Sequence, residues 1–376
     1  MPMPFRPRAG LFALLLLAQS VSVQANESYQ TRDVSITVET LASGLDFPWA
    51  VMPAAGLGYI ITERSGHVRI LSNGTLSAPL PGLPKLYIHG QGGLLDVALS
   101  PDFEKDRLLY FTATQAQKKG VGVILFSARL ADDLSKLDET TVLFRFSAPN
   151  PADYNFGSRI AFSPDGYLFV TIGDHGVPPA AQDLMDDRGA VIRLNRDGSV
   201  PTDNPYYSNL AALPELWSIG HRNPQGIAFD AQDGKLWTVE HGPKGGDEIN
   251  TPEPGKNYGW PVVTYGVNYD DTPVGIGTSA DGFEQPKHYW VPSIAPSALV
   301  VYRGAMFPEW NGDLLISALK GSLISRLIRS PHGDIIGEER FLEDDYGRLR
   351  DIHEDLDGSL LVLTDDDDGK LLRISR

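Results

Sequence analysis

The sequence predicts an all-β protein, a six-bladed β-propeller, and three observations support this. After residue 25 the chain contains no long stretch of helical periodicity. Instead, a short turn followed by an apolar, β-branched or aromatic strand recurs six times, at intervals of 46 to 78 residues. Several of these strands follow an Asp-Gly turn, such as Asp233-Gly234 or Asp357-Gly358, which is a hairpin signal. Radial repetition, with one such strand in each blade, accounts for the six copies.

The six strand units locate the expected blades. They cover residues 58–64, 107–113, 166–174, 234–242, 312–320 and 358–366. Most end in polar residues, so they are expected to deliver polar groups to one end of a central channel. We expect the ring to close by pairing a strand near residues 34–41 with the last blade, which ends at Arg373. A pair of β-sandwiches is the alternative, and six similar units fit it less well.

Residues 1–25 have the features of a secretory signal peptide. Arg6 and Arg8 precede a short apolar run, and Ala25 provides a small residue for cleavage. The run is too short to span a bilayer, and no other stretch is long enough to do so. We therefore expect a periplasmic protein in which residues 26–376 form a single propeller domain.

Charge and cysteine content restrict the partners of this domain. Residues 26–376 contain 30 basic and 48 acidic side chains, so nucleic acid and anionic membrane surfaces are poor partners. The sequence has no cysteine, so neither a disulfide nor a lipid anchor on a cysteine is available. Stability must therefore come from the core and from any bound metal.

The densest group of polar residues and glycines lies at residues 217–269, which we interpret as the floor of an active site. Arg222 and Asn223 stand just before Pro224 and Gly226, a turn context that would hold a guanidinium and an amide in fixed directions. An anionic or carbonyl-rich ligand is the natural partner of such a pair.

A glycine-rich loop, residues 241–246, follows the strand in this stretch and is closed by Asp247 and Glu248. Glycines allow backbone carbonyls to turn inward, and carbonyls with carboxylates are the ligands that calcium requires. The loop lacks the alternating acids of an EF-hand. Spacing alone therefore leaves two equal interpretations, a calcium site and a solvated acidic loop.

Three cationic side chains near strand ends indicate an anionic ligand. Arg348 and Arg350 are two residues apart, so on a strand both face the same way. Lys320 stands at the end of a strand unit. In an acidic protein their convergence suits a ligand with several carboxylates, although surface arginines are commoner than ligand-binding ones. Gln91, in a glycine turn, is by itself an ordinary turn residue.

Seven segments together resemble a known family. They are HGQGGLLDVALSPDF, FGSRIAFSPDGYLFVTIGD, GHRNPQGIAFD, EHGPKGGDEIN, GKNYGWP, ISALK and RLRD, in this order. The set resembles the soluble PQQ-dependent aldose sugar dehydrogenases of the glucose/sorbosone dehydrogenase family, across nearly all of residues 26–376. The resemblance implies a six-bladed propeller that holds pyrroloquinoline quinone (PQQ) over its channel together with calcium. It also implies oxidation of an aldose at its anomeric carbon to a lactone, with an electron acceptor.

The same resemblance implies roles for individual residues. Contacts to PQQ would come from Gln91, Arg222, Asn223, His241, Lys320, Arg348 and Arg350, with Tyr269 as an additional contact. The carbonyls of Gly242 and Pro243 would hold the calcium that touches the cofactor. A further or alternative calcium position would use Glu248 and Tyr258, with Asp247 as an additional ligand. Arg222 would stabilise negative charge that develops on the quinone.

The chain departs from the family pattern at the catalytic base. Family members carry a histidine directly before the motif that reads FGSR here, and this chain has Asn155. An amide does not accept a proton usefully near neutral pH, and loss of a general base typically removes ~10²–10⁴ in rate. Asp153, Tyr154 or His175 could act instead, although His175 is more simply interpreted as a loop histidine.

Two other functions stay open beside the dehydrogenase. One is a propeller that binds the cofactor or a sugar without catalysis, which Asn155 favours and the retained cationic set disfavours. The other is a calcium-dependent lactonase, which would require a channel metal held by side-chain carboxylates.

Overall fold

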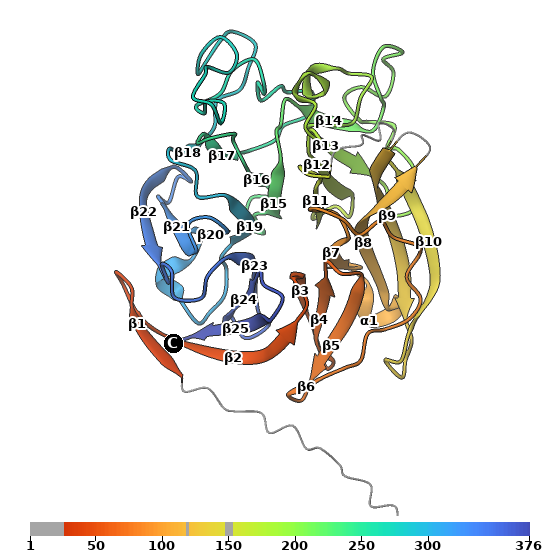
Figure 1. Ribbon diagram of the computed structural model, residues 1–376, viewed down its shortest axis with the longest axis vertical. Helices are drawn as coiled ribbons and strands as arrows, with labels where there is room; N and C mark the ends of the chain where they lie inside the picture. The colour runs from red at the N-terminus through yellow and green to blue at the C-terminus, as the bar shows by residue number, and fades with distance from the viewer. Residues whose placement is uncertain (1–25, 118–119, 147–152) are drawn as a thin grey trace, which may run out of the picture.

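The computed structural model describes residues 26–117, 120–146 and 153–376. Its strands form six antiparallel sheets arranged as a ring around a central axis (Figure 1), which confirms the predicted six-bladed propeller. The expected signal peptide, residues 1–25, lies outside the described residues. Within the described residues, no helix is long and apolar enough to cross a membrane.

The first three blades follow the chain in order. Blade 1 contains β3 (Pro48–Ala54), β4 (Gly58–Glu63), β5 (His67–Ser72) and β6 (Thr75–Leu76). Blade 2 contains β7 (Leu94–Leu99), β8 (Leu108–Gln117), β9 (Gly120–Leu130) and β10 (Leu137–Arg145), with the short helix α1 (Phe103–Asp106) after its first strand. Blade 3 contains β11 (Gly157–Phe162), β12 (Leu168–Ile172), β13 (Ala190–Leu194) and β14 (Leu216–Ile219), with a 3-10 turn, η1 (Pro178–Gln182).

The other three blades complete the ring. Blade 4 contains β15 (Pro224–Phe229), β16 (Leu236–Glu240), β17 (Asp247–Asn250) and β18 (His288–Trp290). Blade 5 contains β19 (Pro296–Val301), β20 (Leu314–Ala318), β21 (Leu323–Arg329) and β22 (Ile335–Phe341), with the 3-10 turn η2 (Pro308–Trp310). Blade 6 contains β23 (Leu349–Glu354), β24 (Leu360–Thr364), β25 (Gly369–Ser375), β2 (Ser35–Leu45) and β1 (Glu27–Gln30).

Each of the six predicted strand units is the second strand of its blade, in the order β4, β8, β12, β16, β20 and β24. These strands are apolar along nearly their whole length because the neighbouring blades cover both faces of each sheet. In β12 and β24, for example, every residue is buried. Burial on both faces favours continuous runs of β-branched and large apolar residues, which is why this strand repeats visibly in the sequence.

The predicted closure of the ring is confirmed. Strand β2 pairs antiparallel with β25, with Thr37 opposite Ser375 and Glu39 opposite Arg373. The last blade therefore combines both ends of the described chain (Figure 1). This pairing covers the edge that β25 would otherwise expose.

A β-bulge interrupts the innermost strand of every blade close to its start. The ladder registers skip between Pro48 and Ala50, Leu94 and Val97, Gly157 and Ile160, Pro224 and Gly226, Pro296 and Ala298, and Leu349 and Asp351. A bulge leaves residues out of the ladder and redirects their side chains. The residues released in this way include Trp49, Asp96, Arg159, Gln225, Ser297 and Arg350.

The guanidinium of Arg159 contacts the bulges of the other five blades at the axis of the propeller. Arg159 Nη1 lies 3.1 Å from Asp96 Oδ1, and its guanidinium carbon lies 4.1 Å from the centroid of the Trp49 ring. Its other nitrogens donate to the carbonyls of Gln225, at 2.8 Å, Ser297, at 2.8 Å, and Arg350, at 3.2 Å. We call this arrangement the Arg159 hub.

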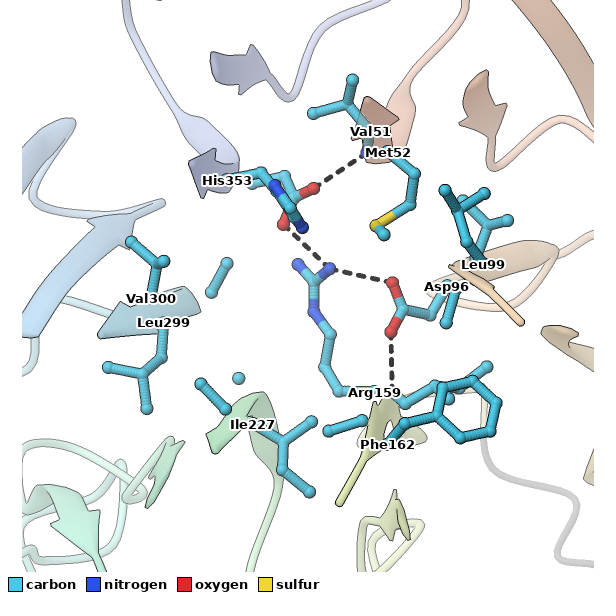
Figure 2. A pocket seen from close by; sticks show the side chains of 18 residues that line it. Val51, Met52, Asp96, Leu99, Arg159, Phe162, Ile227, Leu299, Val300 and His353 are labelled. Carbon is cyan, nitrogen blue, oxygen red and sulfur yellow. Dashed lines mark hydrogen bonds and ion pairs between the residues drawn. The ribbon is translucent and has the colours of Figure 1, made fainter. Parts of the chain in front are cut away.

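The hub divides the central channel into two cavities. One has a volume of about 250 Å³ and is lined by the inner strands of all six blades, with Asp96 and Arg159 paired in its wall (Figure 2). There Arg159 Nη1 also pairs with Asp351 Oδ1 at 2.9 Å. The other cavity, of about 150 Å³, is lined by Trp49 and Arg350 among others, and we call it the axial pocket.

Candidate active site

The axial pocket brings together five residues that the sequence singles out. Strand ends and loops from different blades supply its polar lining, which includes Gln91, Asn223, Gln225, His241, Arg348 and Arg350. Of these, Gln91, Asn223, His241, Arg348 and Arg350 were predicted as ligand contacts. The convergence follows from the fold, because the inner strands of a propeller begin at the same face of the ring.

Two amides hold the segment before β11 at the pocket. Gln91 Oε1 accepts a hydrogen bond from the backbone N–H of Asn155 at 2.8 Å. Asn223 Oδ1 accepts from the backbone N–H of Gly157 at 3.0 Å and from Gln225 Nε2 at 3.2 Å. The amides therefore fix the backbone beside the predicted base position.

Asn155 is buried and its side chain is bound to an acid. Its Nδ2 donates to Asp174 Oδ1 at 2.9 Å, and Trp260 Nε1 donates to Asp174 Oδ2 at 2.9 Å. The backbone N–H of Gly176 adds a third hydrogen bond to Asp174, at 2.8 Å. Asn155 has φ +58, a left-handed conformation that asparagine, aspartate and histidine adopt most readily among residues other than glycine.

The other predicted proton acceptors lie close by, in different surroundings. Both ring nitrogens of His175 are buried without a hydrogen-bond partner among the described residues, and the ring packs 5.0 Å from that of Phe156. Burial, with a contribution from the charge of Arg188, lowers the pKa of His175 to about 3. His175 is thus a core residue and lines neither the axial pocket nor its neighbour. Asp153 pairs with His89 at 2.8 Å, and Tyr154 is half exposed.

A buried hydrogen-bond chain positions Arg222. The backbone N–H of Arg222 donates to Glu240 Oε2 at 2.6 Å, and Glu240 Oε1 lies 2.8 Å from His221 Nδ1. His221 Nε2 lies 2.9 Å from Ser218 Oγ. Ser218 and His221 have no exposed surface, so this serine–histidine–glutamate chain cannot reach a substrate. It orders the turn instead, and Arg222 Nη1 donates to Gly242 O at 2.8 Å.

His241 lines both the axial pocket and a smaller cavity next to it, which we call the loop cavity. Its Nε2 lies 2.7 Å from Pro296 O, and because a carbonyl only accepts, Nε2 carries the proton. Burial lowers the pKa of His241 to about 3, and the charge of Arg222 adds to this. The imidazole is therefore neutral at physiological pH, with Nδ1 available as an acceptor.

The loop cavity has two acidic side chains on its wall. It is lined by Arg222, Glu240, His241, Gly242, Glu248 and Tyr258, among others. Burial, with a contribution from the charge of Glu240, raises the pKa of Glu248 to about 8. Asn250 Nδ2 donates to both carboxylates, to Glu240 Oε1 at 3.0 Å and to Glu248 Oε2 at 3.2 Å. Two buried carboxylates that share one neutral donor favour a cation between or beside them.

The predicted calcium ligands divide into two groups. Gly242, Glu248 and Tyr258 line the loop cavity. The hydroxyl of Tyr258 donates to Thr251 O at 2.5 Å. The hydroxyl is therefore engaged, and the backbone carbonyl of Tyr258 is better placed to bind an ion. Pro243 is buried in the same loop but does not line the cavity. Among the described residues, no cluster of three or more His, Cys, Asp or Glu side chains could hold a metal.

Asp247 requires a correction to the predicted ligand set. Its Oδ1 accepts from Gly242 N at 2.9 Å, and its Oδ2 accepts from Ile294 N at 2.8 Å and Ala295 N at 3.0 Å. Ser293 Oγ donates to the same carboxylate at 2.7 Å. These donors come from the loop itself and from the segment before β19. Asp247 therefore ties the two segments together and is not free to bind calcium.

At the opposite wall of the axial pocket, Arg348, Arg350 and Asp365 form what we call the basic cluster. Asp365 Oδ2 accepts from Arg348 Nη2 at 3.1 Å and from Arg350 Nη2 at 3.0 Å. Arg350 Nε is buried and has no partner among the described residues. Burial lowers the pKa of Arg350, and the charge of Asp365 acts against this shift. The cluster thus carries a surplus positive charge and an unused donor.

Three predicted contacts do not line the axial pocket. Arg222 lines the loop cavity instead, and the other two are Tyr269 and Lys320. Tyr269 is 75% exposed, on the long loop between β17 and β18. Lys320 is exposed just after β20, although its neighbour Leu319 lines the pocket. The structure therefore does not bring these two side chains together with the other predicted contacts.

The sequence analysis assigned no individual role to four residues at or near the site, which are Arg64, Asp174, Glu240 and Asp365. Each lies at or just beyond the end of a predicted strand unit, where polar side chains were expected in general. The signal in the sequence that could have identified these residues is their position at the end of the second strand of a blade. What the sequence did not reveal is which strand-end residues face the pocket.

Comparison with known proteins identifies relatives over almost the whole chain. A family profile described as Glucose / Sorbosone dehydrogenase matches residues 45–373. Aldose sugar dehydrogenase YliI of Escherichia coli (strain K12) is 42% identical over 348 residues, which is 91% of this chain and 93% of that protein.

Solved structures agree with this match. The crystal structure of the soluble aldose sugar dehydrogenase from Escherichia coli, in its apo form, superposes with a TM-score of 0.88 at 40% identity, and the match covers 90% of this chain and 99% of that one. The PQQ-bound form of the aldose sugar dehydrogenase from Streptomyces coelicolor gives a TM-score of 0.74 at 26% identity, covering 90% and 98%. The chain belongs to the glucose/sorbosone dehydrogenase family, as the resemblance of its motifs predicted.

Proposed function

We propose that this protein is a PQQ-dependent aldose sugar dehydrogenase, which oxidises the anomeric carbon of an aldose to a lactone, with calcium as a second cofactor. The basic cluster carries this proposal. Arg348 and Arg350 share the single carboxylate of Asp365, and Arg350 Nε has no partner among the described residues. Guanidinium groups with surplus charge and free donors favour a ligand with several carboxylates.

The residues of the axial pocket fit PQQ, a flat tricarboxylate. Arg348 and Arg350 would bind carboxylates, while Gln91 and Asn223 present amides from the facing blades. When bound, PQQ supplies the oxidant that accepts a hydride from the anomeric carbon. Lys320 and Tyr269 would join the site only through movement of their exposed side chains. The streptomycete relative, described as PQQ-bound, supports this choice of cofactor.

The loop cavity supports the proposal of calcium. Gly242 O accepts one hydrogen bond from Arg222 and has a second lone pair. Glu248, whose pKa burial raises to about 8, would be stabilised in its charged form by a divalent cation. Tyr258, which lines the same cavity, would add its backbone carbonyl. Pro243 does not line this cavity, so its carbonyl belongs to the separate calcium position that the resemblance implies. Asp247 would hold the loop in shape rather than contact the ion.

Arg222 and Asn155 would have separate roles beside the substrate. Arg222 lines the loop cavity next to His241, which lines both cavities, and its guanidinium would stabilise negative charge as the sugar is oxidised. The amide of Asn155 cannot take the proton from the anomeric hydroxyl. We therefore propose a slow enzyme, limited by the missing base at position 155.

Export to the periplasm is part of this proposal. Its support is the signal-peptide pattern of residues 1–25, which predicts cleavage after Ala25. An electron acceptor would then reoxidise the cofactor outside the cytoplasm. Nothing in the site selects a particular acceptor or a particular aldose.

Steady-state assays would test the proposal. Purified residues 26–376 are incubated with PQQ and calcium, then mixed with a panel of aldoses and an artificial electron acceptor. We expect acceptor reduction that needs PQQ, calcium and an aldose together, with lactone as product. Acceptor reduction that does not depend on PQQ would contradict the proposal.

A PQQ- or sugar-binding protein without turnover is the second candidate. The hydrogen bond between Asn155 and Asp174 favours this second candidate. In it a neutral amide, which cannot act as a base, donates to the carboxylate of Asp174. In that case PQQ would bind to the protein but no aldose would be oxidised. The lactonase stays the third candidate, and lactone hydrolysis by the calcium-loaded protein without PQQ would favour it.

A further inference from the structure

A third arginine faces the axial pocket beside the basic cluster. Arg64 directly follows β4, and its backbone N–H donates to Phe47 O at 2.9 Å, while its carbonyl accepts from Leu94 N at 3.3 Å. Its guanidinium carbon lies 4.5 Å from the centroid of the Phe47 ring. The main chain and this ring hold the side chain against the pocket wall.

The guanidinium donors of Arg64 are unused. Among the described residues its side chain makes no hydrogen bond, and its single ion-pair partner, Asp365 Oδ1, lies 3.9 Å from Nη1. That distance is beyond a hydrogen bond. The Arg64 side chain is 21% exposed, and none of its nitrogens is among the fully buried atoms without a partner. Its donors are therefore accessible and free to bind a ligand that enters the axial pocket.

Two other arginines with largely buried side chains, Arg193 and Arg329, use donors within the fold, whereas Arg326 and Arg350 each keep a donor without a hydrogen-bond partner among the described residues. Arg193 Nη1 donates to Asp203 at 3.0 Å and to Asn204 at 3.1 Å. Arg329 Nη1 donates to Asp230 at 2.9 Å and to a backbone carbonyl at 2.8 Å. Arg64 differs from both because its free donors lie at a cavity wall.

The charge around Arg64 also favours an anion. Asp365 is the one carboxylate paired with the three arginines, and its Oδ2 is already engaged by Arg348 and Arg350. Burial acts to raise the pKa of Asp365, but the charges of the three arginines, Arg350 foremost, outweigh it and hold that pKa below its usual range. Asp365 is therefore ionised at neutral pH. Three guanidinium groups against one carboxylate leave a local surplus of two positive charges.

We propose that Arg64 is a further ligand-binding residue of the axial pocket and binds a carboxylate of the cofactor that Arg348 and Arg350 also bind. The proposal rests on the proposed function, because it takes PQQ as that cofactor. Asp365 positions the three guanidinium groups around a shared point without neutralising them. The Phe47 ring keeps the Arg64 guanidinium extended, so that little side-chain freedom is lost when the carboxylate binds.

Equilibrium binding of the cofactor tests this role without relying on turnover. The wild-type protein and the variants Arg64→Gln, Arg64→Lys and Arg340→Gln are titrated with PQQ in the presence of calcium, and quenching of tryptophan fluorescence is followed. Arg340 is an exposed arginine on β22, so Arg340→Gln removes the same charge away from the pocket. A second titration uses the trimethyl ester of PQQ, which lacks the negative charges. Circular dichroism and thermal unfolding check that each variant is folded.

We expect Arg64→Gln to weaken PQQ binding by about ten- to a hundredfold, the loss typical of a hydrogen bond between charged groups. Arg64→Lys should recover part of this loss, and Arg340→Gln should bind like the wild type. The penalty of Arg64→Gln should disappear with the ester, because its partner charge is then absent. Equal PQQ affinity of wild type and Arg64→Gln would overturn the assignment of Arg64 alone. Failure of the wild type to bind PQQ would overturn the proposed function, and this inference with it.

Discussion

Asn155 stands where the resemblance of the motifs predicts a catalytic histidine. Its backbone is held by Gln91, and its side chain donates to Asp174, which accepts two further hydrogen bonds from Trp260 and Gly176. Three donors thus surround the carboxylate of Asp174 beside Asn155. Asn155 itself lines neither the axial pocket nor the loop cavity, while its neighbours Phe156 and Gly157 line the axial pocket.

Replacing Asn155 by histidine should raise turnover. Histidine tolerates φ +58, and its ring could donate to Asp174 Oδ1 in place of the amide, which would orient the imidazole as a base. We expect the rate of aldose oxidation to rise by ~10²-fold or more, the usual contribution of a general base. The measurement is the single-turnover rate for Asn155→His, with Asn155→Ala as the control. An unchanged rate would mean that another group takes the proton.

The buried His175 should make the protein sensitive to mild acid. Its pKa is about 3 in the folded protein, and the unfolded chain has an ordinary histidine pKa near 6.5. Between these values the unfolded state binds more protons, so the stability present above pH 6.5 is lost as the pH falls towards 3. From pH 7 to pH 5 this amounts to about 2 kcal/mol for one histidine.

Urea unfolding at pH 7 and pH 5 measures this effect. The loss of unfolding free energy between the two pH values should be about 2 kcal/mol smaller in His175→Leu than in the wild type. The control, His332→Leu, changes an exposed turn residue and should leave the pH dependence as it is. Identical pH dependence in wild type and His175→Leu would show that the ring titrates in the folded protein as it does in the unfolded chain.

At the scale of elements, the second strand of each blade was predictable and the innermost strand was not. Second strands such as β12 are buried on both faces, and their apolar runs repeat visibly in the sequence. Innermost strands such as β11 and β15 mix polar, glycine and apolar residues, because a bulge turns part of each strand towards the channel. The bulges arise from the packing of six sheets around one axis, which no local pattern encodes.

The strength of the local sequence pattern also explains which residues of the candidate site could be predicted and which could not. Residues in dense motifs, such as Arg222, Asn223 and Glu248, were predicted because their sequence context is unusual. Arg64 and Asp365 were not, because each follows an ordinary strand among other charged residues, Arg64 after Glu63 and Asp365 at the start of the run Asp365–Asp368. Asp247 was assigned to calcium by its position next to Glu248, but alternate residues of β17 face opposite sides and Asp247 bonds to the segment before β19.

Strand β2 should be essential for the stability of the whole ring. Ile36 on β2 is fully buried in the last blade, where β2 pairs with β25. We expect Ile36→Ala to lower the free energy of unfolding by about 2–5 kcal/mol, the usual range for such a truncation in a core. Glu39→Ala, an exposed position on the same strand, should change it by no more than ~0.5 kcal/mol. An Ile36→Ala midpoint equal to that of the wild type in urea would contradict closure through β2.

At the scale of the whole molecule, the Arg159 hub joins all six blades at one guanidinium. It also forms the floor between the axial pocket and the cavity in Figure 2, with Asp96 and Asp351 on the far side. The hub is thus both a structural connection and the base of the candidate site. Because Arg159 lies on the axis of the propeller, its single side chain can have both roles.

Removing the Arg159 guanidinium should strongly destabilise the protein. In Arg159→Met, Asp96 and Asp351 would remain buried without their cation, and removal of one partner from a buried pair costs about 3–5 kcal/mol. Urea unfolding of Arg159→Met and of the exposed control Arg340→Met measures the difference. A loss below ~1 kcal/mol for Arg159→Met would show that the blades hold together without the hub.

The axial pocket should hold PQQ in a form that an aldose can reduce. Stopped-flow absorbance of the protein loaded with PQQ and calcium, mixed with aldoses without any acceptor, tests this most directly. The account predicts that the bound cofactor is reduced in one slow phase, whose rate rises with aldose concentration and increases in Asn155→His. A bound cofactor that stays oxidised with every aldose, in both the wild type and Asn155→His, would contradict the account and leave a cofactor-binding protein in its place.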